Sequence, residues 1–270
     1  MTDSPRRHAT IFHVLLDEKV PSQERTLFRL GQEAISLIGA GGITTQHTLQ
    51  TMTYHILANP PVVARLTAEL KQAMPDPNIP ASLQQLQHLP YLSAVISEGL
   101  RLSYGISHRM ERSYPDRAFK YGDYVLPPNT SVSMTTMLIH DDPSIFPEPR
   151  KFIPERWLDS EQDQDSLPTP ISNDNAYNDG GEKPLQQEQS QQQRLAKYLL
   201  PFGRGSRVCV GLNLAYAELY LALANIFRKF ELELYDVVRE RDVDVSHDFF
   251  NPSPALESVG VRVRVVGRVA

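Results

Sequence analysis

Apolar residues recur at helical spacing over three long stretches in the first hundred residues of the chain. The first stretch, residues 22–58, meets no proline before Pro60. Its apolar stripe consists of Leu27, Leu30, Ala34, Leu37 and Ile38. A second helix is predicted from Pro60 to about Met74, because proline is tolerated in a first helical turn. A third begins at Pro90 with YLSAVISEGLRL, so this part of the chain is predicted to be helical.

The pattern changes after Tyr104. Short alternating segments in residues 118–134, broken by glycine and proline, predict β-hairpins. Residues 159–193 are dominated by Asp, Asn, Ser, Gly and Gln, which predicts a disordered surface insertion. A long apolar helix over 212–230 and two alternating runs, ELELYD and VGVRVRVV, follow. The fold class expected is mainly α with small β-hairpins, in three regions: 1–158, 159–193 and 194–270.

Composition and charge narrow the possible partners. The net charge is -5 and the 27 Lys and Arg residues are scattered, so nucleic acid is not expected and a small molecule or a protein is favoured. A single cysteine excludes an internal disulfide framework. The N-terminus lacks a secretory signal, and the apolar window 208–227 contains Glu218, so we interpret it as a buried helix and expect no membrane anchor in this chain.

The single cysteine, Cys209, lies in the segment PFGRGSRVCVG just before the long apolar helix. Gly203 and Gly205 would let the backbone turn tightly and approach a flat ligand, and Arg207 could pair with an anionic group on it. A cysteine at a helix N-terminus is favoured as thiolate. The alternative is a buried cysteine that packs as a small apolar side chain.

The spacing Phe-x-x-Gly-x-Arg-x-Cys-x-Gly resembles the haem-binding loop of the cytochrome P450 family. The resemblance implies a P450 fold, of which this chain is the C-terminal haem-binding part, with Cys209 as the thiolate ligand of the iron. We expect Phe202 to pack beside the sulfur and exclude water, and Gly211 to keep the first helical turn uncrowded. Gly203 and Arg207 complete the predicted haem contacts.

Glu98 and Arg101, three residues apart on the third predicted helix, match the family's Glu-x-x-Arg pair. Their neighbours are apolar, so we expect the pair to be buried and to need a further partner. Arg156, in the segment Pro-Glu-Arg-Trp, resembles the third member of this network. An exposed ion pair is the alternative.

Arg109 matches the family's arginine that binds a haem propionate. With Arg207 as a second donor, two guanidinium groups could neutralise two propionates. A solvent-exposed arginine is the alternative. The resemblance further implies substrate-facing residues in 38–44, 104–108 and 249–254.

The segment AGGITT in the first helix resembles the family's oxygen-activation segment, with Thr44 in the position of the threonine that takes part in catalysis. Close helix packing at small residues is the alternative. The family usually has an acid directly before that threonine, whereas this chain has Ile43, which cannot relay protons. We therefore expect proton delivery through Thr44, Thr45 and ordered water.

The resemblance implies a haem-dependent monooxygenase that uses O2, a small and apolar organic substrate, and electrons from NADPH through a flavoprotein reductase. Several motifs resemble fungal members that serve secondary metabolism, trichodiene oxygenase among them. Family members are expected at the endoplasmic reticulum membrane; with no anchor in this chain, the cytoplasm is the alternative. A basic docking face or an ordinary solvated surface could be formed by Lys197, Arg204, Arg228 and Lys229.

Two alternatives to a monooxygenase stay open. The resemblance implies a protein almost twice as long, whose first half this chain is expected to lack, so the chain could be a fragment that keeps the motifs and catalyses nothing. Ile43 also suggests a haem enzyme that isomerises or dehydrates its substrate without a reductase.

Overall fold

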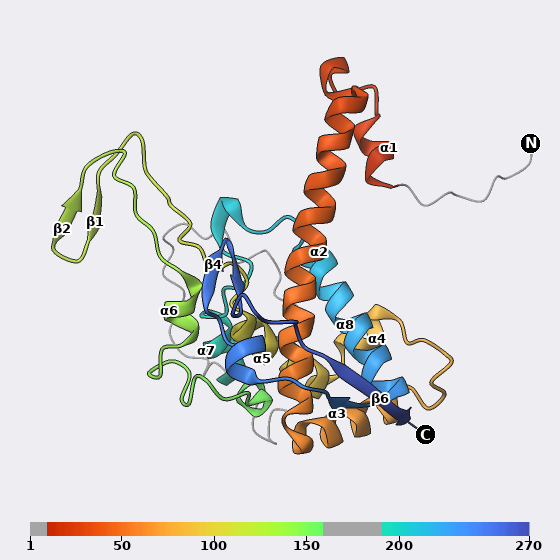
Figure 1. The fold of residues 1–270 in the computed structure, drawn as a ribbon. Helices are drawn as coiled ribbons and strands as arrows, with labels where there is room; N and C mark the ends of the chain where they lie inside the picture. The colour runs from red at the N-terminus through yellow and green to blue at the C-terminus, as the bar shows by residue number, and fades with distance from the viewer. Residues whose placement is uncertain (1–9, 159–190, 270) are drawn as a thin grey trace, which may run out of the picture. The chain divides into compact units, whose positions relative to one another are not determined.

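The computed structural model describes residues 10–158 and 191–269 (Figure 1). The chain forms two units, Met1–Thr44 and Thr45–Ala270, and the boundary falls inside helix α2 (Leu27–Leu57). The predicted polar insertion lies outside the described residues, apart from its last three, which begin a helix.

The first unit contains α1 (Ile11–Leu15), the short 3-10 helix η1 (Ser22–Arg25) and the beginning of α2. Thr26 has an extended backbone, so η1 and α2 are separate where the sequence predicted one helix. Arg29 of α2 joins the two helices through an ion pair with Glu24 of η1 at 2.8 Å, and it pairs with Glu33 within α2 at 2.9 Å. These pairs are exposed, and they therefore stabilise the unit little.

The second unit holds the end of α2 and most of the remaining helices. They are α3 (Pro60–Ala73), α4 (Leu83–Gln87), α5 (Pro90–Ser103), α6 (Thr136–His140), η2 (Pro154–Trp157), α7 (Gln191–Ala196), η5 (Gly205–Arg207), α8 (Leu212–Lys229) and α9 (Arg239–Asp242). The helices predicted from Pro60, from Pro90 and over 212–230 are confirmed within a residue or so.

Helix α5 lies at the centre of the core, packed against α3, α4, α8 and η2. All but two of its residues are buried, as expected of a helix that is apolar on most sides. The helix begins at Pro90, and its first free amides, those of Tyr91 and Leu92, each donate a hydrogen bond of 2.8 Å to the carboxylate of Glu69. It ends at Tyr104, whose left-handed backbone (φ 60°) breaks the helical ladder.

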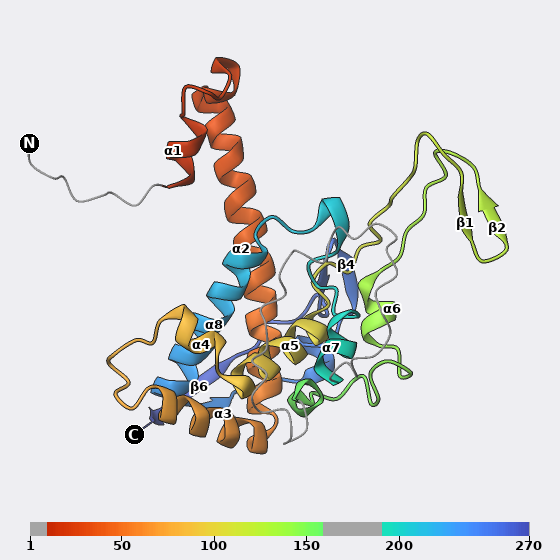
Figure 2. The same cartoon turned by 180° about the vertical axis from the view of Figure 1, so that it is seen from behind.

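Three antiparallel strand pairs complete the described part of this unit. They are β1 (Phe119–Tyr121) with β2 (Tyr124–Leu126), β3 (Phe230–Leu234) with β6 (Val263–Arg268), and β4 (His247–Phe249) with β5 (Asn251–Ser253). Figures 1 and 2 show the β1–β2 hairpin standing away from the helices of its unit. The predicted class, mainly α with small β-hairpins, is confirmed.

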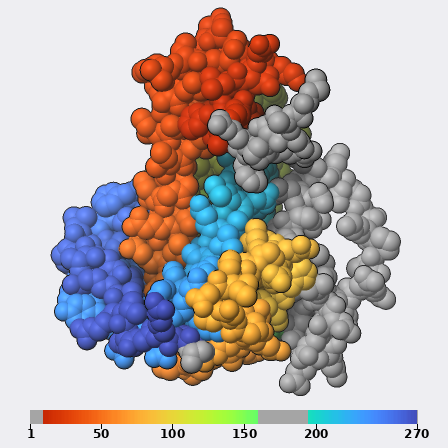
Figure 3. All heavy atoms as spheres, turned by 90° about the vertical axis from the view of Figure 1, so that its right-hand side faces the viewer, coloured from red at the N-terminus to blue at the C-terminus, as the bar shows by residue number. Residues whose placement is uncertain are grey.

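Helix α8 buries one face against α3, α4 and α5, and Figure 3 shows the α4 segment lying against it. Arg228, near its end, is 2% exposed and donates to the carbonyls of Met74, Pro75 and Val269. The apolar window of the sequence is thus a core helix, as predicted. Within the described ranges, no helix combines the length and the apolar character needed to cross a membrane.

Candidate functional site

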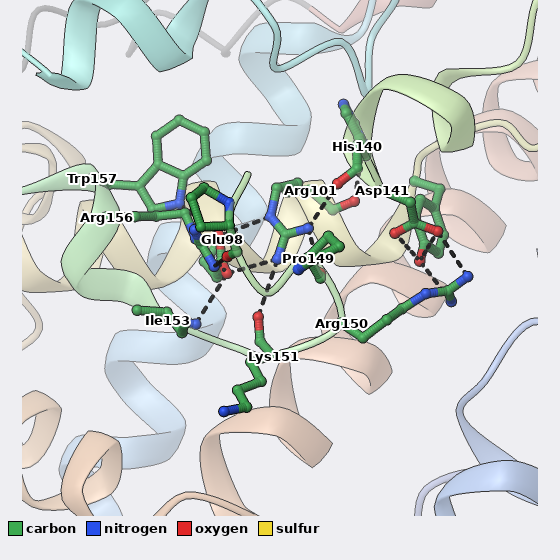
Figure 4. A network of polar contacts seen from close by, with 12 residues as sticks. Glu98, Arg101, His140, Asp141, Pro149, Arg150, Lys151, Ile153, Arg156 and Trp157 are labelled. Atoms are coloured by element: carbon green, nitrogen blue, oxygen red, sulfur yellow. Dashed lines mark hydrogen bonds and ion pairs between the residues drawn. The ribbon is translucent and has the colours of Figure 1, made fainter. Parts of the chain in front are cut away.

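A buried polar network lies between α5 and η2, with Glu98 and Arg101 at its centre (Figure 4). Both side chains are fully buried. Arg101 donates Nε to Glu98 Oε2 at 3.0 Å and Nη2 to Oε1 at 2.7 Å. Its remaining N–H groups reach the carbonyls of His140 (2.9 Å), Pro149 (2.7 Å) and Lys151 (3.1 Å), so each of its five donors has an acceptor.

The carboxylate of Glu98 accepts three further hydrogen bonds. They come from the Ile153 amide (3.0 Å), Arg156 Nε (3.1 Å) and Trp157 Nε1 (2.8 Å). Burial alone would raise the pKa of Glu98, but its bonds and charge interactions with Arg101 and Arg156 outweigh burial and lower the pKa. The prediction of a buried pair with Arg156 as third member agrees with this geometry, whereas the sequence did not indicate the part of Trp157.

His140 connects this network to the segment that precedes the cysteine. The ring is fully buried; Nδ1 lies 2.9 Å from the Arg101 carbonyl and Nε2 lies 3.0 Å from the amide of Leu200. Nothing in the sequence pattern indicated this residue. The backbone of Gly105 also lies close to this segment, because a Cβ on Gly105 would lie 2.1 Å from the carbonyl oxygen of Pro201.

The cysteine loop is folded by its own backbone. Gly203 and Gly205 have φ angles of 70° and 76°, the left-handed region that glycine favours, as the predicted tight turns require. The Cys209 amide donates to the carbonyl of Phe202 at 3.0 Å, which closes the loop, and the thiol is exposed. A Cβ on either glycine would meet no atom within 4 Å, so the loop presents an open face.

Cys209 lies just before α8, which begins at Leu212 with Gly211 as its N-cap. The cysteine therefore directly precedes the N-terminus of the helix, where the sequence placed it. A Cβ on Gly211 would lie 3.8 Å from the Cys209 sulfur, so a larger side chain there would crowd it. The ring of Phe202 lies against Tyr216, with centroids 5.3 Å apart, at the edge of the core.

Arg109 and Arg207 are both exposed. Neither forms a hydrogen bond or an ion pair with any residue that the structure describes. Uncommitted guanidinium groups and an exposed thiol on a glycine-rich loop are the kinds of group that can hold a flat ligand with two negative charges, such as haem.

Helix α2 is uninterrupted through AGGITT. The Thr44 hydroxyl donates to the carbonyl of Ala40, one turn earlier, at 2.7 Å. Thr45 is buried, and its hydroxyl donates to Glu218 Oε2 of α8 at 3.0 Å. No sequence pattern indicated that Glu218 contacts Thr45, because no local feature links residues 173 positions apart.

Two of the segments predicted to face the substrate lie together. Ser107 donates to Asp248 Oδ1 at 2.8 Å, and His108 Nδ1 lies 3.1 Å from Asp248 Oδ2. Phe249 and Phe250, at the tip of the β4–β5 hairpin, are exposed. Ser107 and His108 therefore lie against the β4–β5 hairpin, whereas Tyr104 is buried in the core.

The predicted basic face is only partly exposed. Buried Arg228 cannot belong to it, because its guanidinium is committed to backbone carbonyls at the end of α3 and near the C-terminus. Arg204 is exposed and donates to the carbonyl of Ala196, and Lys197 lies 4.9 Å from the ring centroid of Tyr198.

Several known proteins are similar to this chain over most of its length. A family model described as Cytochrome P450 matches residues 2–257. Cytochrome P450 monooxygenase MO6277 of Ascocoryne sarcoides is 41% identical over 263 residues, 97% of this chain and 46% of the relative. Cytochrome P450 monooxygenase sdnE of Sordaria araneosa is 44% identical with the same two coverages. Tryptophan 6-hydroxylase fscE of Fusarium equiseti is 38% identical over 94% of this chain and 44% of its own. The chain thus spans a little under half the length of these relatives.

Proposed function

The chain belongs to the cytochrome P450 family, and we propose from this that it is the haem-carrying part of a monooxygenase that inserts one atom of O2 into a small organic substrate. The observation that carries the proposal is the exposed thiol of Cys209, held on an open glycine loop. Cys209 would hold a haem there through its thiolate, and the haem would supply the chemistry of oxygen activation. The remaining roles belong to this chain's own residues.

Arg109 and Arg207 would hold the haem propionates. Each guanidinium can donate two parallel hydrogen bonds to a carboxylate, and neither is committed to another group among the described residues. Phe202 would fix the loop through its carbonyl, while Gly203 and Gly211 would leave room for the porphyrin plane and the sulfur.

The threonines of α2 would deliver protons. Ile43 cannot take part, but the hydroxyl of Thr45 is bonded to the carboxylate of Glu218. A carboxylate can accept a proton from water and return it through a hydroxyl, as general acid–base catalysis requires. Glu218 thus offers, from α8, the acid that the sequence lacks before Thr44.

The substrate surface would include residues 105–108 and the tip of the β4–β5 hairpin, where the rings of Phe249 and Phe250 are available for apolar contact. Two relatives are named for the hydroxylation of tryptophan and of N-acetyltryptophan. Indole compounds therefore belong in the first substrate panel, beside the apolar secondary metabolites that the sequence suggested.

Electrons would come from NADPH through a flavoprotein reductase. Arg204, within the cysteine loop, and Lys197, just before it, would contribute to the docking face for the reductase. A reductase-free isomerase or dehydratase is the second candidate, favoured by Ile43 in place of an acid. The two differ in one measurement, because only the monooxygenase needs NADPH for turnover.

The decisive experiment is the spectrum of the purified chain, loaded with haem, reduced and exposed to carbon monoxide. The red-shifted Soret band of thiolate-bound haem is expected for the native chain and should be lost in Cys209→Ala, because alanine offers no ligand. Lys197→Ala, which lies outside the loop, is the matched control and should keep the band. A native chain without the band would favour the inactive fragment.

A further inference from the structure

His140 uses both nitrogens of its ring. The Arg101 carbonyl can only accept, so Nδ1 carries the proton and donates to it at 2.9 Å. The Leu200 amide can only donate, so Nε2 is the acceptor, at 3.0 Å. These two bonds fix one neutral tautomer of the ring.

The two partners of His140 belong to different parts of the site. Arg101 belongs to the Glu98 network. Leu200 directly precedes the loop of residues 201–211, and its carbonyl accepts the amide of Gly203 at 3.0 Å, in the first turn of that loop. The ring of His140 therefore joins the network to the beginning of the loop.

The position of the ring is itself fixed. Arg101 Nη1 donates to the carbonyl of His140 at 2.9 Å, so each side chain bonds to the other's backbone. Tyr104 stacks on the ring with centroids 6.3 Å apart, and Phe146 meets it edge-on at 6.4 Å. With no exposed surface, the ring has little freedom to reorient.

We propose that His140 is a positioning residue that transmits the geometry of the buried Glu98–Arg101–Arg156 network to the cysteine loop through its hydrogen bond to the Leu200 amide. The inference rests on the proposed function in one respect, that the loop binds haem. Without this bond the first turn of the loop would be freed, and fewer molecules would hold the thiolate where iron can reach it.

The surroundings of His140 keep Nε2 unprotonated, so that it can accept the hydrogen bond of the Leu200 amide. The pKa of His140 is lowered to about 4, mainly by burial and also by the charge of Arg101; the hydrogen bond to the Arg101 carbonyl and the charge of Glu98 act in the opposite direction. The ring is therefore neutral at pH 7, with Nε2 unprotonated.

Two substitutions separate the two bonds. In His140→Asn the side-chain amide can replace Nδ1–H toward Arg101 but is too short to reach Leu200. In His140→Gln the longer side chain can place its carbonyl oxygen near the position of Nε2 and accept the Leu200 amide. We expect the Leu200 amide of the haem-free 270-residue chain to exchange with solvent about tenfold faster in the Asn variant, with the Gln variant close to the native rate.

The same pair is then compared after haem is added. The Asn variant should lose part of its thiolate-type carbon monoxide band and the Gln variant should retain it. A merely structural role would lower the stability of both variants without this split. Equal exchange rates and equal bands in the Asn variant and the native chain would overturn the inference.

A measurement on the native chain covers the case in which the Asn variant does not fold. Nitrogen-15 spectroscopy should detect a scalar coupling between the Leu200 amide and His140 Nε2 across the N–H···N bond, and its absence would overturn the inference. If the coupling and the exchange pattern are found in a chain that shows no thiolate band, the positioning of the loop stands and the proposed function fails.

Discussion

At the scale of single residues, Glu98 is one of the two most constrained side chains of the polar network, together with Arg101. Its carboxylate is fully buried and accepts five hydrogen bonds. A buried ion pair adds little net stability when complete, but removing one member leaves the other charge without compensation. Substitution of Glu98 therefore tests both that Arg101 is buried and that the two side chains form an ion pair.

Glu98→Gln should lower the free energy of unfolding by about 3–5 kcal/mol, because Arg101 would keep its charge in the core without a counter-ion. Urea denaturation measures this. Glu33→Gln, which breaks the exposed pair with Arg29, is the control and should leave the unfolding midpoint unchanged within error. Similar losses in the two variants would contradict the buried network.

The proposed role of Glu218 in proton delivery can be tested together with that of its hydrogen-bond partner, Thr45. Glu218→Gln should slow substrate oxidation by about tenfold or more and divert electrons to hydrogen peroxide, because an amide cannot deliver the proton. Product formed per NADPH consumed is the measurement. Thr45→Ser, which keeps the hydroxyl, should retain coupling that Thr45→Val loses. Unchanged coupling in Glu218→Gln would exclude the proton path.

At the scale of elements, the end of α5 and the start of the cysteine loop meet at Gly105 and Pro201. Gly105 has a φ of 67°, and a Cβ on it would lie 2.1 Å from the Pro201 carbonyl oxygen. The contact joins two backbone segments, so neither can relax by moving a side chain. Helix packing and loop position are therefore linked at this point.

Gly105→Ala should destabilise the chain by more than the ~1–2 kcal/mol of left-handed strain alone, since the methyl group also displaces the loop. Thermal unfolding and the carbon monoxide spectrum report the two effects. Gly122→Ala is the control: its φ is also left-handed, at 57°, but a Cβ there meets open space, so its loss of stability measures the backbone strain alone. A Gly105→Ala chain that matches Gly122→Ala in both readouts would show that the contact is unimportant.

At the scale of the whole molecule, buried histidines link stability to pH. Burial lowers the pKa of His55 and of His140 to about 4, whereas an unfolded histidine titrates near 6.5. Between these values the unfolded chain binds more protons than the folded one. The contribution is complete above pH 6.5 and is lost as the pH falls toward 4.

The free energy of unfolding should therefore fall by about 2 kcal/mol between pH 7 and pH 5.5, roughly 1 kcal/mol from each histidine. Urea denaturation at the two pH values measures the change. Replacing His55 by Phe, which preserves a ring to stack on Phe152, should remove about half of it. Equal stability at both pH values would mean that the rings are solvated.

The sequence by itself determined the helices, the hairpin regions, the glycine turns and the family. These depend on local properties: apolar spacing gives α5 and α8 their buried faces, Pro90 opens a helix, and Gly203 and Gly205 supply left-handed backbone. The loop motif is likewise a local pattern, so Cys209 could be identified without a structure. The match of the family model to residues 2–257 shows the family that this motif indicated.

Only the tertiary structure decided which distant groups meet. Thr45 bonds Glu218, His140 bonds Leu200, and Arg228 turns into the core instead of facing a partner. The physical reason is that a buried donor or acceptor must find its partner wherever the packed chain provides one, regardless of sequence separation. A local sequence pattern therefore cannot indicate which distant residue supplies that partner.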